Sequence, residues 1–328
     1  MSDTLSNYPV LSVRDLSVSI PTRNGVLKPV DEVSFDIAAG EILGVVGESG
    51  AGKSMTGNAV IGLLTAPTHI SGGEIWLQNE RIDHLKGEAM RRLRGKHIGM
   101  VFQDPLTSLN PLLTIGDQLR ETILEHLDAS ESEANQRAIE GLREVGIPAA
   151  EERIDAYPHQ FSGGMRQRVV IALALCAEPS LIIADEPTTA LDVSVQAQII
   201  ALLRRLCRER GTAIMLITHD MGVIAETADR VAVMYAGRMA ELGSAREVLS
   251  APTHPYTIGL MGSTPLASAG RDRLVQIEGS MPRLDALPTG CAFNPRCTRA
   301  QDKCRTDPRP RLDAHEGRAA CWFAGEEK

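Results

Sequence analysis

One glycine-rich segment has the composition and spacing of a loop that binds phosphate. Residues 47–54 fit the pattern GxxxxGK[ST]. Glycines let the backbone approach phosphate oxygens closely, and a helix that begins at the end of the loop presents free N–H groups and a positive dipole end. We expect Lys53 to reach the β- and γ-phosphates of a nucleotide and Ser54 to bind Mg²⁺. The candidate residues are Gly47, Glu48, Ser49, Gly50, Ala51, Gly52, Lys53 and Ser54.

Two acidic residues follow a short apolar segment further along the chain. Leu181–Ala184 contains only apolar residues, as is typical of a buried strand, and Asp185 and Glu186 come directly after it. A carboxylate at the end of a strand beside a phosphate-binding loop is suited to hold Mg²⁺, and we assign that role to Asp185. Glu186 stands one residue further on, where it can polarise an attacking water, so we predict that it is the general base.

The elements around these residues indicate an α/β fold with a parallel core sheet. Ile42–Val46 is a nearly continuous apolar run before the loop, and helical spacing begins at Lys53. Apolar runs return at Leu181–Ala184 and Ala213–Ile217, and the helical stretch Val193–Arg210 separates them. This order of strand, helix and strand is typical of βαβ units, whose strands lie parallel.

Three further regions surround this core. Val10–Ile37 alternates apolar and polar residues and predicts a small N-terminal antiparallel sheet. Residues 104–177 show helical spacing without a strand pattern, so we expect a helical subdomain there. Its helices are expected at residues 115–127, 132–145 and 164–176. After about residue 250 the composition shifts to Pro, Arg, Cys and Gly with weak periodicity. We therefore predict a nucleotide-binding domain over residues 1–250 and an irregular C-terminal extension over residues 251–328.

A second helix begins with a serine and two glycines. Ser162, Gly163 and Gly164 stand at the start of a helical pattern, where free N–H groups favour an anion. The segment from Phe161 to Gln167, Phe-Ser-Gly-Gly-Met-Arg-Gln, resembles the LSGGQ signature of the ATP-binding-cassette (ABC) family. The resemblance implies that these residues close onto the γ-phosphate of an ATP bound to a partner subunit. Two ATP molecules are then buried between head-to-tail subunits, and hydrolysis separates the subunits again.

Further motifs follow in the order of that family. Gln103, in Val-Phe-Gln-Asp, resembles the Q-loop glutamine that senses Mg²⁺ and water. Thr189–Asp192 resembles the D-loop, which assigns Asp192 to the nucleotide site. His219, in Ile-Thr-His-Asp, resembles the switch histidine that positions the γ-phosphate and water. These matches imply an ATPase with ATP and Mg²⁺ as cofactors. The implied Mg²⁺ ligands are Ser54, Gln103 and Asp185.

Finer features are similar to the ATPases of oligopeptide and dipeptide importers. They are the exact residues of the loop at 47–54, Gly-Glu-Ser-Gly-Ala-Gly-Lys-Ser, the segments Gln103–Pro105 and Ser108–Pro111, and the segment Pro252–Thr257. The resemblance covers nearly the whole chain and implies an ATPase subunit bound peripherally at the cytoplasmic face of the cell membrane. The implied partners are two membrane-spanning permease subunits, a second and different ATPase subunit in a head-to-tail dimer, and a periplasmic or extracellular substrate-binding protein.

Two other functions stay open at this point. Related ATPases serve importers of nickel, oligosaccharides or opines, and the sequence discriminates poorly against them. ABC ATPases of DNA repair or translation resemble either two cassettes in one chain or a cassette split by a long coiled coil. Here a single cassette is present, and no sustained heptad run separates Lys53 from Ser162. The sequence therefore favours a transport ATPase.

Two departures from the family pattern concern individual side chains. Ile20 stands about where many members stack an aromatic residue on adenine, and such stacking contributes about 1–3 kcal/mol in nucleic-acid sites. We therefore predict weak discrimination between ATP and GTP. Phe161 and Met165 replace the leucine and glutamine of the signature. Because Ser162 and both glycines remain, we expect activity to survive.

Four cysteines crowd the C-terminal extension with the spacing C-x5-C-x6-C-x16-C. Four thiolates suit an iron–sulfur cluster or tetrahedral zinc, the absence of a C-x2-C pair disfavours zinc, and free thiols are the third alternative. Peptide-importer ATPases carry a similar tail, and the resemblance implies a [4Fe-4S] cluster. The four residues are Cys291, Cys297, Cys304 and Cys321. Cys176 and Cys207 lie on apolar helix faces, and we expect both to be buried in the core.

The overall composition limits the remaining classes of function. No apolar run approaches the roughly 20 residues of a membrane-spanning helix. The polar segment Met1–Tyr8 lacks the basic and apolar regions of a secretory signal, so a cytosolic location is expected. The net charge of −8 argues against a nucleic-acid partner. The arginine-rich clusters at 91–96 and 204–210 are expected to be solvated helix faces.

Overall fold

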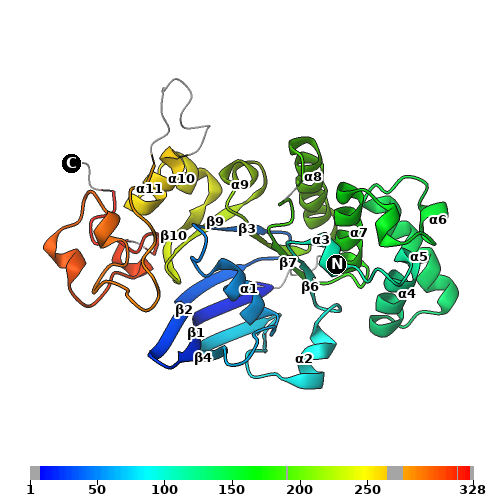
Figure 1. Cartoon of the computed structure of the whole chain (residues 1–328), viewed down its shortest axis with the longest axis horizontal. Helices are drawn as coiled ribbons and strands as arrows, with labels where there is room; N and C mark the ends of the chain where they lie inside the picture. Colours follow the sequence, from blue (N-terminus) through cyan, green and yellow to red (C-terminus); the bar gives the residue numbers. More distant parts are fainter. Residues whose placement is uncertain (1–7, 190, 264–275, 316, 326–328) are drawn as a thin grey trace, which may run out of the picture. The chain divides into compact units, whose positions relative to one another are not determined.

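The computed structural model describes residues 8–189, 191–263, 276–315 and 317–325. Ala190 of the D-loop motif and residues 1–7 of the N-terminal segment lie outside the described residues, as do residues 264–275 of the extension. The chain divides into two compact units, whose elements are shown in Figure 1. Unit 1 comprises Met1–Ala38, Ile42–His84 and Ile217–Lys328, and unit 2 comprises Ala39–Glu41 and Leu85–Leu216.

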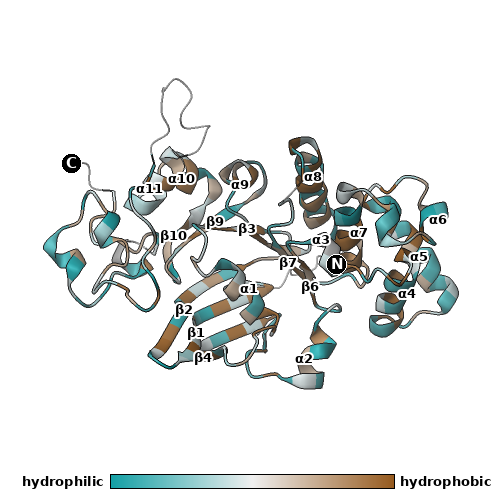
Figure 2. Ribbon diagram, in the orientation of Figure 1, coloured by the Kyte–Doolittle hydropathy of each residue, from teal (hydrophilic) through white to brown (hydrophobic). Residues whose placement is uncertain are grey.

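Unit 1 contains a four-stranded antiparallel sheet in the order β2-β1-β4-β5. Its strands are β1 (Leu11–Thr22), β2 (Gly25–Ile37), β4 (His69–Leu77) and β5 (Glu80–Arg81). The antiparallel sheet predicted for this region is present, and Figure 2 shows hydrophobic and hydrophilic bands along the strands. β1 is not half-buried as its alternation predicts, because Ser12, Ser17 and Ser19 are buried together with the apolar residues beside them. The sequence pattern does not predict β4, because Gly73, with a φ of 86°, interrupts its alternation.

A second set of strands in unit 1 leads into the glycine-rich loop. β3 (Ile42–Val46) lies parallel to β9 (Arg230–Tyr235), and β9 pairs with the antiparallel strand β10 (Arg238–Ser244). Every residue of β3 is buried, as its continuous apolar run predicts. The helices of unit 1 are α1 (Lys53–Val60), α9 (Met221–Thr227), α10 (Ala245–Ser250) and α11 (Pro255–Gly262).

Unit 2 combines parallel strands with helices. β6 (Ile98–Val101) and β7 (Leu181–Asp185) are parallel, and β8 (Ala213–Ile217) follows β7 in the order β8-β7-β6. The helices predicted at 115–127, 132–145, 164–176 and 193–210 are confirmed, with small differences at their ends. The helices are α2 (Gly87–Leu93), α3 (Pro105–Ser108), α4 (Ile115–His126), α5 (Glu131–Glu144), α6 (Ala150–Arg153), η1 (Pro158–Gln160), α7 (Gly163–Leu175) and α8 (Val193–Arg210).

Side-chain caps fix where the helices of unit 2 begin. At the start of α5 the Ser130 hydroxyl accepts the N–H of Glu133, and the Glu133 carboxylate accepts the N–H of Ser130, which forms a capping box. Ser162 caps α7 and Asp192 caps α8. Two residues that the sequence assigns to the nucleotide site therefore also determine where two helices start.

Two arginines of the cluster at 91–96 lie on a solvated helix face, as expected. Arg91 and Arg92 lie on the exposed face of α2, and both donate to Glu88. Among the described residues, no helix is long and apolar enough to cross a bilayer.

The C-terminal extension contains short helices and an added strand segment. Besides α11, it has the 3-10 helices η3 (Asn294–Arg296), η4 (Asp302–Arg305) and η5 (Leu312–His315). Ala319 forms an antiparallel bridge with Glu241, and the N–H of Leu242 donates to the carbonyl oxygen of Arg318 at 2.8 Å. The tail thereby pairs with β10 and satisfies backbone groups that an edge strand leaves open.

Candidate nucleotide site

The glycine-rich loop, here called the phosphate loop (residues 47–54), requires its glycines. Gly47 and Gly52 have φ values of 149° and 101°, which residues with a Cβ rarely adopt. A Cβ at Gly47 would lie 2.2 Å from the carbonyl oxygen of Met234, and one at Gly52 would lie 2.4 Å from that of Pro29. The loop therefore packs directly against neighbouring backbone of unit 1, and only glycine fits at these two positions.

Lys53 lies inside this loop. Its ammonium group donates to the carbonyl oxygen of Gly47 at 2.8 Å and to that of Glu48 at 3.1 Å, and the residue is buried. The positive charge is thus held next to backbone N–H groups that favour an anion. Around it, Ser49, Gly50 and Ser54 are exposed, and Ala51 is buried.

Glu48 is bound by two residues from the C-terminal part of unit 1. Its backbone N–H donates to the Tyr256 hydroxyl at 2.9 Å, and its carboxylate accepts a hydrogen bond from Arg296 at 2.9 Å. Sequence reasoning missed both partners, which lie 208 and 248 residues further along the chain. Only Tyr256 had a signal, because it belongs to the Pro252–Thr257 motif that carried the family resemblance.

In unit 2 the structure brings Gln103 and Glu186 together. The Gln103 amide donates to Oε2 of Glu186 at 3.3 Å, and the Thr189 hydroxyl donates to the same oxygen at 2.8 Å. Asp185 ends β7 immediately before this carboxylate. Glu186 has a φ of 48°, a strained value for a residue with a side chain, and such strain gathers at functional positions. Two donors and a constrained backbone therefore orient the predicted base.

The signature segment also meets the start of α8, the helix that follows the D-loop, in unit 2. At the start of α7 the Ser162 hydroxyl accepts the N–H three residues further on at 3.4 Å, and Ser162 and Gly163 are exposed. A Cβ at Gly164 would lie 2.7 Å from Cγ1 of Val195, so the first turns of α7 and α8 are packed together. Asp192 accepts the N–H of Val195 at 2.9 Å, and this bond lowers the pKa of Asp192.

His219 follows β8, as predicted, and its side chain is exposed. The next residue, Asp220, caps α9 by accepting the N–H of Gly222 at 2.8 Å. Unit 1 therefore contains the phosphate loop and His219. Unit 2 contains the other predicted residues, Gln103, Asp185, Glu186, Ser162, Gly163, Gly164 and Asp192. The catalytic roles of all these residues stay predictions.

The departures from the family pattern fit their surroundings. Phe161 is buried, with the guanidinium of Arg153 5.7 Å from its ring centroid, so the larger side chain is packed rather than exposed. Ile20 is half-buried on β1 and pairs with Leu27 of β2. Its aliphatic side chain presents no aromatic face, and the prediction about nucleobase selectivity stays open to test.

The four cysteines of the extension lie near one another. Burial raises the pKa of Cys291 to about 12, and the neighbouring thiols of Cys321, Cys304 and Cys297 add to this effect. The N–H of Cys291 also donates to the carbonyl oxygen of Cys304 at 2.9 Å. Across the described part of the chain, however, no group of three or more His, Cys, Asp or Glu side chains is arranged to hold a metal ion. Cysteine sulfur is the donor that an iron–sulfur cluster takes, but the four side chains are not arranged as a set of ligands for one.

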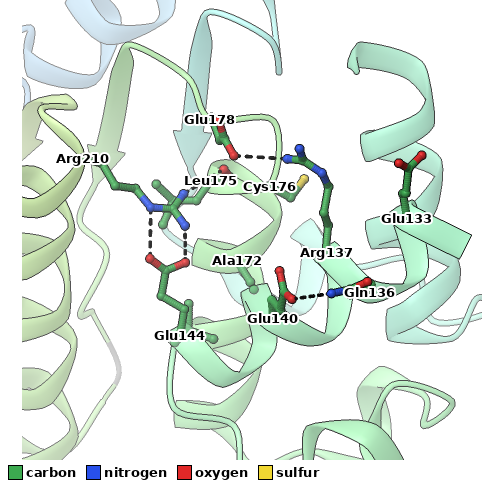
Figure 3. A pocket seen from close by; sticks show the side chains of 12 residues that line it. Glu133, Gln136, Arg137, Glu140, Glu144, Ala172, Leu175, Cys176, Glu178 and Arg210 are labelled. Carbon is green, nitrogen blue, oxygen red and sulfur yellow. Dashed lines mark hydrogen bonds and ion pairs between the residues drawn. The ribbon is translucent and has the colours of Figure 1, made fainter. Parts of the chain in front are cut away.

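A pocket of about 570 Å³ in unit 2 is lined by α5, α7 and the end of α8 (Figure 3). Arg210 donates to Glu144 at 3.0 Å and Arg137 to Glu178 at 3.2 Å across it, and its lining contains none of the predicted site residues. Cys176 lines this pocket and is only half-buried, so the prediction of a core cysteine is wrong for Cys176. It is right for Cys207, which is fully buried.

Known proteins with similar sequences identify the family. Residues 30–189 match the family described as ABC transporter, and residues 240–304 match the one described as oligopeptide/dipeptide transporter, C-terminal region. The chain is 47% identical to the dipeptide transport ATP-binding protein DppD of Bacillus subtilis, over 96% of this chain and 94% of that protein. It is also 47% identical to the oligopeptide transport ATP-binding protein OppD of Escherichia coli, over 97% and 94%.

Solved structures agree with this match. One of them is the ATP-binding cassette MJ0796, solved as a dimer in a post-hydrolysis state with ADP and Pi. It matches this chain with a TM-score of 0.65 and 28% identity, and the match covers 72% of this chain and 99% of that structure. The structure of cbiO1 from Clostridium perfringens, part of an ABC transporter complex, has a TM-score of 0.65 and 29% identity, with coverage of 75% and 92%. The chain therefore belongs to the ABC transporter family. Within it, the chain falls among the oligopeptide and dipeptide transport ATP-binding proteins, as the motifs predicted.

Proposed function

We propose that this chain is the ATP-hydrolysing subunit of an importer that moves dipeptides or oligopeptides across the cell membrane. The observation that carries the proposal is the oriented carboxylate of Glu186, in a chain that also has a phosphate loop with Lys53 buried inside it. The relatives named above are peptide transport ATP-binding proteins matched over nearly their full length. The reaction is the hydrolysis of ATP to ADP and phosphate, coupled to translocation by partner membrane subunits.

The residues of the site divide the chemistry among them. The phosphate loop binds the β- and γ-phosphates through its N–H groups and the Lys53 ammonium. Ser54, Gln103 and Asp185 are the residues that would hold Mg²⁺, as the family resemblance implies, and the ion would neutralise charge on the phosphates. Glu186 accepts a hydrogen bond from the attacking water, and the donors on its Oε2 keep that carboxylate in place. His219 positions the γ-phosphate and the water.

The exposed signature residues support a role in a second active site. Ser162 and Gly163 are exposed at a helix start, where N–H groups can reach an anion supplied by another subunit. We assign Ser162, Gly163, Gly164 and Asp192 to the ATP of a partner ATPase subunit in a head-to-tail dimer. The other partners are two permease subunits and a substrate-binding protein, with this chain bound peripherally at the cytoplasmic face of the membrane.

A [4Fe-4S] cluster in the extension is the second part of the proposal. The proximity of the four cysteine thiols and their sulfur donors support it, although without the metal they do not form a ligand set. Iron, sulfide and zinc should be measured in anaerobically purified protein, with Cys304→Ser as the test and Cys207→Ser as the control. About four iron atoms per chain, lost only in Cys304→Ser, would support the cluster. Iron and zinc both well below one atom per chain would contradict it.

Uptake of a labelled dipeptide tests the transport function and its substrate together. Cells should carry the wild-type protein, Glu186→Gln, or the control Glu209→Gln, which changes an exposed residue of α8. Unlabelled tripeptides, sugars and nickel serve as competitors. We expect uptake with the wild type and the control, none with Glu186→Gln, and displacement by peptides alone. Displacement by sugars or nickel would show that the chain serves a related importer for those substrates and not a peptide importer.

A further inference from the structure

The acidic residue of the phosphate loop is held by the C-terminal extension. Nη1 of Arg296 donates to both carboxylate oxygens of Glu48, at 2.9 and 3.1 Å, and the Glu48 N–H donates to the Tyr256 hydroxyl at 2.9 Å. The extension therefore contacts one loop residue twice, through its backbone and its side chain. We call Tyr256 and Arg296 the loop-anchoring pair.

Arg296 is fixed in place by groups of the extension and of β9. Its Nε donates to the carbonyl oxygen of Glu278 at 2.9 Å, and its Nη2 donates to that of Gly279 at 3.3 Å. The guanidinium lies over the rings of Tyr235 and Phe293, 5.8 and 6.0 Å from their centroids. Its side chain is 7% exposed. A surface ion pair contributes little because its side chains are mobile and solvated, but this arginine is buried and immobilised.

Tyr256 is equally well fixed. It is fully buried at the start of α11 and packs against Tyr235, with ring centroids 4.6 Å apart, and against Phe293, at 5.4 Å. The segment before it is secured by Glu241, which is itself fully buried. Its carboxylate accepts the N–H of Thr253 and that of His254, each at 2.9 Å. The Pro252–Thr257 motif thus places one hydroxyl against the phosphate loop.

The charge of Glu48 makes this contact relevant to nucleotide binding. The Lys53 ammonium lies 3.1 Å from the backbone carbonyl oxygen of Glu48, so a phosphate bound to Lys53 lies near the backbone of this residue. The Glu48 carboxylate belongs to the same residue, and its charge would be only partly screened from the phosphate, since the Debye length is about 8 Å at physiological salt. A carboxylate without a partner there would repel a triphosphate. Arg296 neutralises that charge and directs the side chain toward the extension.

We infer that the C-terminal extension prepares the phosphate loop for ATP in the same chain, with Arg296 and Tyr256 as positioning residues for nucleotide binding. This inference rests on the proposed function, because it takes the loop as the ATP site. It gives the extension a defined task in the ATPase cycle, and it accounts for the Pro252–Thr257 motif by a contact with the loop rather than with a partner subunit.

The test is a charge-rescue experiment on the purified full-length protein. ATP affinity, and kcat and KM for ATP, are measured for Arg296→Ala, Glu48→Gln and the double variant, with thermal unfolding recorded without nucleotide. We expect Arg296→Ala to weaken ATP binding and to raise KM about tenfold, while kcat changes less than about twofold. A tenfold loss of affinity corresponds to about 1.4 kcal/mol. Removing the uncompensated carboxylate in the double variant should restore most of the affinity, even if the extension is less stable.

Two further variants separate the possible outcomes. Arg305→Ala removes an exposed arginine that pairs with Asp302 inside the extension, and it should leave ATP affinity unchanged. Lys53→Ala should abolish ATP binding, and if it does not, the proposed nucleotide site fails. If Lys53→Ala abolishes binding while Arg296→Ala has no effect, or if the double variant binds ATP as weakly as Arg296→Ala, the inference about the extension is overturned and the nucleotide site stands.

Discussion

The phosphate loop and the signature segment are both glycine-rich helix starts, but the rest of the chain holds them very differently. At Gly47 and Gly52 a Cβ would collide with backbone carbonyl groups, and the loop is anchored by Arg296. At Gly163 a Cβ would meet no heavy atom of the described residues within 4 Å. The first segment is shaped in advance by its own chain, whereas the second is exposed at Ser162 and Gly163, which agrees with its proposed role in the site of another subunit.

The largest difference between the two segments should appear on adding one methyl group. Gly47→Ala forces a strained φ and a backbone collision, so we expect ATP affinity to fall by about 100-fold or more, equivalent to about 2.7 kcal/mol. Gly163→Ala is the matched control and should leave the ATP affinity of the isolated chain within about twofold. Calorimetric titration with ATP measures both. Equal losses of ATP affinity in the two variants would show that the packing around Gly47 does not distinguish the phosphate loop from the exposed start of α7.

The same two segments show how far sequence reasoning reaches. The signature segment was found through its resemblance to LSGGQ, whereas the phosphate loop was found because glycines, a lysine and a serine at fixed spacing before a helix have a local physical meaning. The short apolar runs of β3, β7 and β8 were found for the same reason. β6, with only four residues, gave too short a pattern, and β4 was hidden by Gly73. The pairing of Glu48 with Arg296 spans 248 residues and depends on tertiary packing, which no local pattern contains.

Acid should weaken the support on which the phosphate loop depends. Burial lowers the pKa of His254 to about 4, so the folded protein keeps this imidazole neutral while the unfolded chain is protonated below about 6.5. The contribution of neutral His254 to the free energy of unfolding is therefore fully present above pH 6.5 and is lost as the pH decreases toward 4. This residue lowers the free energy of unfolding by at most about 1.4 kcal/mol per pH unit. Thermal unfolding between pH 7 and 5 measures the slope.

The control for this effect is His254→Asn. Asparagine can still accept the N–H of Tyr256, as Nδ1 of His254 does at 3.0 Å, but it does not titrate. The variant should show a shallower pH dependence than the wild type. An identical slope would mean that other groups cause the acid sensitivity.

The Glu186 carboxylate of unit 2 is oriented by two side-chain donors, Gln103 and Thr189, and removing one of them tests this role. Thr189→Val deletes the hydroxyl that donates to Glu186 at 2.8 Å. We expect kcat to fall about tenfold with ATP affinity unchanged, because a hydrogen bond to a charged group is worth about 1.5 kcal/mol. Thr122→Val removes a hydroxyl that donates to a backbone carbonyl of α4 and should have no effect on kcat. A change in ATP affinity rather than in kcat would argue against the orienting role.

The smallest expected effect concerns the nucleobase. Wild-type protein should bind ATP and GTP with affinities within a few-fold of each other, because Ile20 offers no aromatic face. Ile20→Tyr should tighten ATP binding about fivefold through stacking worth about 1 kcal/mol. Leu27→Tyr, on the paired position of β2, is the control and should change nothing. A strong preference of the wild type for ATP would show that another group recognises the base.

Hydrolysis of ATP by this chain should depend on Glu186 as the general base. The most direct measurement compares steady-state ATP hydrolysis and ATP affinity of wild-type protein and Glu186→Gln, each assembled with its membrane partners. We predict that kcat falls at least about 100-fold while ATP affinity is retained, because general-base catalysis contributes about 10²–10⁴ in rate. Hydrolysis at the wild-type rate in Glu186→Gln would show that Glu186 is not the base.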